Sequence, residues 1–136
     1  MSIWMPAVLL EGALLVACAY DVRTRRVPAW LTVILLLAGL ALAARPGGSG
    51  IGQSLAGIAV GLLTLPFVLL GGLGAADALL LAGVGSWEGW SLALRTACWT
   101  AVAGGLIALG LRFWRGKHDF AYVPAIAIGF AVAALT

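Results

Sequence analysis

The sequence contains very few charged residues. Of its 136 residues, eight are Lys or Arg and five are Asp or Glu, whereas 63% are hydrophobic. Soluble domains carry roughly 25% charged residues because their surface must face water. Thirteen charges cannot cover a globule of this size, but they can lie at the ends of helices whose sides face lipid. This composition, with a mean hydropathy of +1.12, excludes a soluble domain and indicates an integral membrane protein.

Histidine and cysteine are also scarce. The chain has one histidine, His118, and two cysteines, Cys18 and Cys98, which lie in separate apolar segments. A zinc site of three or four nitrogen and sulfur ligands cannot be assembled from these residues. No Ser/His or Cys/His set for nucleophilic catalysis is present either. We therefore expect neither a metal nor another cofactor, and we interpret the cysteines as small apolar residues.

Apolar segments recur along the whole chain. A helix needs about 20 apolar residues to span a bilayer, or about 17 at the short end. The fourth segment is clearly shorter, and it can exist if neighbouring helices shield it or if its start lies in a protein-lined cavity. No repeat, linker or soluble domain interrupts the pattern, which predicts an all-α, polytopic membrane helix bundle forming a single domain over residues 1–136. Its six expected segments are 3–20, 29–44, 51–70, 75–86, 88–111 and 120–135.

Basic residues are concentrated on one side of this topology. Loops one and five (residues 21–28 and 112–119) hold six of them, whereas the opposite side has only Arg45 and, a short way into segment five, Arg95. Because basic loops remain in the cytoplasm, we expect loops one, three and five there and both termini outside. Membrane topology thus explains the net charge of +3 better than a nucleic-acid partner does. The six basic residues are Arg23, Arg25, Arg26, Arg112, Arg115 and Lys117.

Two acidic residues lie at positions where they could act together in catalysis. Asp21 ends the first segment and Asp77 opens the fourth, both at the expected cytoplasmic face. Each could be an ordinary helix-end acid, Asp77 being favoured by the dipole of its helix. Acids at membrane depth are costly, however, and two that reach one face from different helices can share a proton. One carboxylate then activates water while the other, protonated, polarises a carbonyl, which predicts peptide hydrolysis without a metal.

The other three acids have simpler interpretations. Glu88 and Asp119 lie at segment borders, where a solvated carboxylate is expected. Glu11 lies inside the first segment, at about the same depth as Arg95 in the fifth, roughly 10–12 Å below the outer ends. One hypothesis pairs the two charges, since buried charges are usually paired. In the alternative, Arg95 extends outward and Glu11 is protonated.

Three stretches of the chain resemble the type IV prepilin peptidases. Residues 21–31, DVRTRRVPAWL, are similar to the first signature, an aspartate followed by arginines and Ile/Val-Pro-Asn. Residues 72–87, GLGAADALLLAGVGSW, are similar to the second, which contains a GxGD motif. Residues 120–129, FAYVPAIAIG, resemble the last helix of the family, with its proline and glycine. The chain departs from these patterns at Ala29 (usually Asn), Ala76 (the second motif glycine) and Leu79 (usually Lys).

The resemblance implies a GxGD-type membrane aspartyl endopeptidase of the bacterial inner membrane. Such enzymes remove the basic leader of a prepilin at the cytoplasmic face, after a glycine that precedes a hydrophobic helix. The resemblance implies that Asp21 and Asp77 are the catalytic residues. The positions that it implies to shape the site or bind substrate are Gly74, Ala76, Arg23, Arg26 and Pro28.

The resemblance also bears on a second activity. Larger bacterial members carry a cytoplasmic domain with paired CxxC motifs and methylate the new N-terminus. Those motifs are not found in this sequence, so we expect a peptidase without methyltransferase activity, similar to the short peptidases of Flp/tight-adherence pilus systems. Two alternatives stay open: a catalytically degenerate member that acts as a pilus-assembly partner, and an unrelated proton-coupled transporter. The transporter would need acids along a path through the membrane, where only Glu11 is suitably placed.

Overall fold

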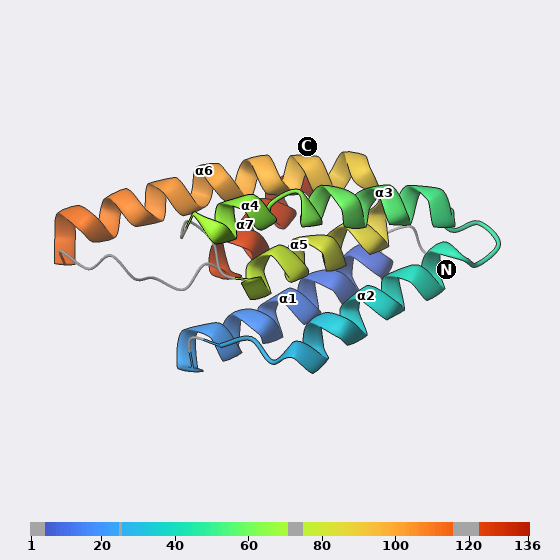
Figure 1. The fold of residues 1–136 in the computed structure, drawn as a ribbon, viewed down its shortest axis with the longest axis horizontal. Coiled ribbons are helices and arrows are strands. Elements are labelled where there is room, and N and C mark those ends of the chain that lie inside the picture. The colour runs from blue at the N-terminus through green and yellow to red at the C-terminus, as the bar shows by residue number, and fades with distance from the viewer. Residues whose placement is uncertain (1–4, 25, 71–74, 116–122) are drawn as a thin grey trace.

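The structure is a computed structural model in which the described residues form seven α-helices and no β-strand (Figure 1). The described ranges are 5–24, 26–70, 75–115 and 123–136. This architecture confirms the expected all-α membrane helix bundle. The helices are α1 (Met5–Thr24), α2 (Ala29–Ala43), α3 (Ile51–Leu62), α4 (Leu65–Leu69), α5 (Ala75–Glu88), α6 (Trp90–Arg115) and α7 (Val123–Leu135).

Three stretches are long and apolar enough to cross a membrane: α1, α3 with α4, and α6. The helices α2 and α7 are apolar but shorter. The expected third segment, 51–70, is divided into α3 and α4 at Leu63 and Thr64. Pro66 explains the division, because it has no N–H to donate and its ring opposes the carbonyl four residues earlier. At the break the hydroxyl of Thr64 donates to the carbonyl of Gly61 at 2.6 Å.

Two helices extend beyond the ends expected from hydropathy. The helix α1 continues to Thr24, so Asp21 lies in a helix and not in loop one. The helix α6 continues to Arg115, so Arg112 is also helical and not part of loop five. Arginine is a good helix former and can extend its charge toward water, so a first charge does not end a helix. Three other charged residues of these loops lie outside the described ranges: Arg25, Lys117 and Asp119.

The short helix α5 lies at the centre of the bundle, against α2, α3 and α6 (Figure 1). From Asp77 to Ser86 its side chains are buried, except that of Leu79. Of the two possibilities for this short segment, the structure shows the one in which neighbouring helices shield it. The helix ends at Glu88. The next residue, Gly89, has a φ of +85°, which suits glycine, and α6 begins directly after it.

Small residues let α3 and α5 approach closely. A Cβ at Gly57 would overlap the backbone of Gly85, and one at Gly61 would also overlap the backbone of α5. Close contact through glycine is a common way to associate helices in membranes, where the hydrophobic effect does not drive association. Across the same interface the hydroxyl of Ser54 donates to the carbonyl of Ser86 at 2.8 Å. The position of α5, and therefore of Asp77, is fixed by this packing.

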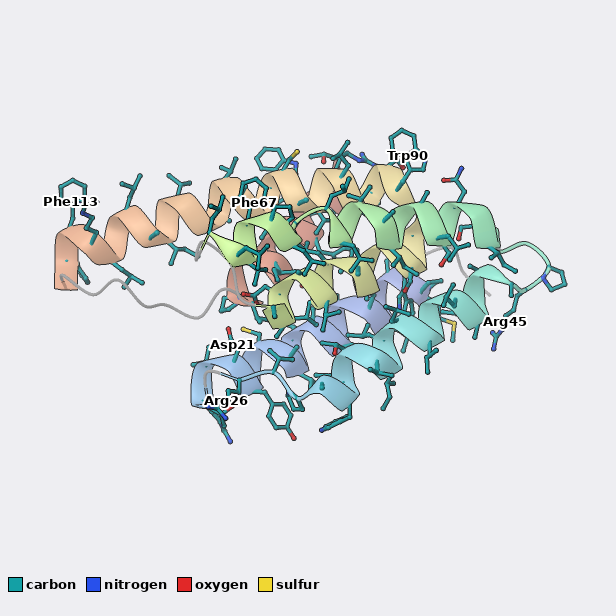
Figure 2. The ribbon with its side chains drawn as sticks, viewed as in Figure 1. Asp21, Arg26, Arg45, Phe67, Trp90 and Phe113 are labelled. Atoms are coloured by element: carbon teal, nitrogen blue, oxygen red, sulfur yellow. The ribbon has the colours of Figure 1, made fainter. Side chains whose placement is uncertain are left out.

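The two sides of the expected topology correspond to the two ends of the bundle. Figure 2 shows Asp21 and Arg26 at one end, and Arg45 and Trp90 at the other. The end with Asp21 also contains the start of α5 and the start of α7 (Figure 1). We call it the aspartate end.

Candidate active site

Asp21 lies in the last turn of α1 and is only 8% exposed. Its Oδ2 atom accepts a hydrogen bond from the backbone N–H of Val123, with 3.1 Å between nitrogen and oxygen. Val123 is the first residue of α7, 102 positions further along the chain. The first N–H groups of a helix have no acceptor within the helix and readily bind anionic groups. The bond therefore joins a sequence-predicted catalytic residue to the start of a distant helix.

Asp77 lies in the first turn of α5 and is also 8% exposed. A carboxylate in this position is favoured by the dipole of its own helix. The end of α1 and the start of α5 lie at the same end of the bundle (Figure 1), and the two helices are in contact. The structure thus buries both aspartates at the aspartate end, each on a different helix.

This burial argues against the interpretation of the two acids as solvated helix-end carboxylates. A solvated helix-end carboxylate would be exposed, whereas burying a charged carboxylate is costly unless other groups compensate. Two buried carboxyl groups at one end of a membrane bundle can divide the work of general acid and general base. Among the described residues, no three His, Cys, Asp or Glu side chains form a group that could bind a metal.

Two arginines near the connection between α1 and α2 are exposed. Arg23 and Arg26 are exposed, and Pro28 is half-buried. The Oγ1 atom of Thr24 lies 2.8 Å from the carbonyl oxygen of Tyr20 and 2.9 Å from that of Arg26. These contacts close the last turn of α1 directly after Asp21. Exposed arginines at a helix end can interact with anionic lipid headgroups, which suits the basic side of a membrane protein.

Ala76 is half-buried and is the second residue of α5. Alanine is the most favourable helix former, so this departure from the GxGD pattern causes no backbone strain at its position. Its methyl group still occupies space beside Asp77 that glycine would leave open. Gly74, the first glycine of the motif, lies outside the described residues.

Glu11 and Arg95 do not form an ion pair in the described part of the chain. The Oε2 atom of Glu11 is buried without a hydrogen-bond partner, and the side chain of Arg95 is exposed. This arrangement agrees with the alternative in which Arg95 extends outward.

Sequence reasoning did not assign a role to Val123. Its contribution is a backbone N–H, which every residue type except proline possesses. One signal was present in the sequence, because Pro124 follows it and proline is favoured in the first turn of a helix. If a helix start is placed at this proline, the first backbone N–H groups of that helix are expected to lack a partner within it.

Comparisons with known proteins give one family. The sequence profile described as the type IV leader peptidase family matches residues 8–109, which include both aspartates. Similar curated proteins are the prepilin leader peptidase/N-methyltransferases of Burkholderia pseudomallei strain 1026b, Dickeya chrysanthemi and Pectobacterium carotovorum subsp. carotovorum.

The identities are 32% over 134 residues, 33% over 141 and 31% over 147, respectively, and the matches cover 90%, 93% and 93% of this chain. The chain spans about half the length of these relatives, with 43%, 49% and 52% of each matched. No solved structure matches the chain significantly.

Proposed function

Because the chain belongs to the type IV leader peptidase family, we propose that it hydrolyses the leader peptides of prepilins with Asp21 and Asp77 as its catalytic carboxylates. The observation that carries the proposal is the burial of both aspartates at one end of the bundle. The family match supports a peptidase, and the names of the three relatives support prepilins as substrates.

The proposed reaction needs one ionised and one protonated carboxyl group. The ionised one takes a proton from water, whose oxygen forms a bond to the peptide carbon, while the other gives its proton to the carbonyl oxygen. In the second step the newly protonated carboxyl passes its proton to the amide nitrogen, and the C–N bond breaks. The other carboxylate recovers a proton from the hydroxyl that becomes the new carbonyl. Both groups return to their starting states, and no metal or covalent intermediate is needed.

We further propose that cleavage takes place at the cytoplasmic face of a bacterial inner membrane. The exposed Arg23 and Arg26 at the aspartate end support this orientation through the bias of basic residues toward the cytoplasm. The hydrophobic helix of the prepilin would enter between the helices of the bundle, while its basic leader stays at the surface near the aspartates.

The experiment uses purified protein in detergent or liposomes together with a cognate prepilin. We expect cleavage on the carboxyl side of the leader glycine, and we expect Asp21→Asn and Asp77→Asn each to abolish it, because one carboxylate cannot serve as both base and acid. Glu88→Gln, which changes an acid in the last turn of α5, is the matched control and should cleave normally. Full cleavage by either asparagine variant would instead favour a non-catalytic pilus-assembly partner.

A further inference from the structure

The helix α1 is held in the bundle mainly by α7. It packs against α7 and contacts α2 and α5 only lightly. One face of α1 is buried at helical spacing, and Asp21 is the last residue of that face. The position of Asp21 relative to α5 therefore depends on α7. The buried residues are Leu10, Leu14 and Ala17 on α1, and Val123, Ile126, Phe130 and Ala133 on α7.

The hydrogen bond between Val123 and Asp21 satisfies a requirement on both sides. The N–H of Val123 is one of the first four of α7, so it has no acceptor within its helix. Val123 is completely buried, and a buried N–H must find a partner. The Oδ2 atom of Asp21 accepts it, and a buried carboxylate needs such a donor in turn.

We infer that the backbone N–H of Val123 is a positioning group for the catalytic carboxylate of Asp21, an inference that rests on the proposed function. The bond holds Oδ2 and thereby fixes the plane of the carboxylate. The other oxygen, Oδ1, makes no hydrogen bond to the described residues and is the one that exchanges a proton during hydrolysis. The helix α7 is thus a third contributor to the site, beside α1 and α5.

The test removes this N–H without changing the side chain. An amide-to-ester replacement at Val123 substitutes oxygen for the backbone nitrogen and its hydrogen. Because hydrogen bonds to charged groups contribute about 1.5–3 kcal/mol, we expect kcat for prepilin cleavage to fall about 10- to 100-fold. The KM should stay within about twofold, since no substrate contact is changed. The matched control is the same replacement at Ala127, where the lost N–H bonds only within α7, and kcat should be retained there.

A second measurement does not depend on activity. Thermal unfolding in detergent is compared for the ester at Val123 in the wild-type chain and in an Asp21→Ala chain. We expect the ester to lower the melting temperature only when Asp21 is present, whereas the Ala127 ester should lower it in both backgrounds. If the Val123 ester lowered the melting temperature equally in the two backgrounds, the hydrogen bond between Val123 and Asp21 would be refuted. Coupling to Asp21 with an unchanged kcat would overturn the positioning role. Coupling without any cleavage by the wild-type chain would refute the proposed function and this catalytic role, and leave only the contact.

Discussion

At the scale of single residues, Ala76 separates two explanations for the glycine usually found in the second position of the GxGD motif. If the glycine were needed for a positive φ, alanine would strain the chain, but Ala76 lies inside α5. The remaining explanation is space, because alanine adds a methyl group at the position directly before Asp77.

Ala76→Gly should therefore preserve or raise the rate of prepilin cleavage. It should also lower the free energy of unfolding by up to about 1 kcal/mol, because glycine is a poorer helix former than alanine. Initial rates and thermal unfolding in detergent measure the two effects. Ala75→Gly, at the exposed first residue of α5, is the control for helix propensity alone. A sharp loss of cleavage in Ala76→Gly would mean that the site requires the methyl group.

The residue scale also yields a prediction about Glu11, whose buried Oε2 atom has no hydrogen-bond partner among the described residues. Because Glu11 buries an oxygen without a hydrogen bond, Glu11→Leu should raise the free energy of unfolding by about 1 kcal/mol or more. Arg95→Met should lower stability no more than Leu94→Met does, since both residues are exposed. Thermal unfolding of the three variants in one detergent is the measurement. A much larger loss of stability in Arg95→Met than in Leu94→Met would favour the hypothesis that Glu11 and Arg95 form an ion pair.

The same scale shows which site residues a sequence can reveal. Asp21 and Asp77 were predicted from their side chains, because an acid at membrane depth is costly and therefore informative. The role proposed for Val123 could not be predicted in this way, because it depends on a backbone group whose partner is 102 positions away.

At the scale of elements, hydropathy predicted that the helices exist but misplaced their ends. It ended the first and fifth segments at or before a charged residue, although α1 continues to Thr24 and α6 to Arg115. It also joined α3 and α4, because Pro66 is compatible with an apolar run although it cannot continue the backbone hydrogen bonds. Helix ends depend on hydrogen bonds and on tertiary contacts, which apolar content alone does not encode.

The close approach of α3 and α5 gives the prediction for this scale. Gly57→Ala should lower the free energy of unfolding by about 1–3 kcal/mol, because its Cβ would overlap the backbone of Gly85 and the helices would have to separate. Gly52→Ala lies on the same helix and is the matched control, since no atom lies within 4 Å of its Cβ. Its stability should be unchanged or up to about 1 kcal/mol higher. Equal effects of the two changes, measured by unfolding in detergent, would contradict the tight interface.

At the scale of the whole molecule, the bundle has two chemically different ends. The aspartate end contains Asp21, the starts of α5 and α7 and the exposed Arg26, and the opposite end contains Arg45 (Figure 2). Between them α1 is 20 residues long, or about 30 Å at 1.5 Å per residue, which equals the hydrocarbon thickness of a typical bilayer. In the proposed function, a bundle of this length would hold the substrate helix within the membrane while the scissile bond reaches the aspartates near the membrane surface.

The two ends lead to a topology prediction for the intact protein in its membrane. In a chain whose Cys18 and Cys98 are replaced, Thr24→Cys should react with an impermeant maleimide only from the cytoplasmic side. Ser49→Cys, in the connection between α2 and α3, should react only from the outside, because the connection lies beside Arg45 at the opposite end. Gly116→Cys, at a position outside the described residues, should follow Thr24→Cys. The measurement compares labelling of right-side-out and inverted vesicles. If Thr24→Cys and Ser49→Cys were both labelled from the same side, the bundle would not cross the membrane along its long axis. The aspartates would then need another route to a cytoplasmic leader.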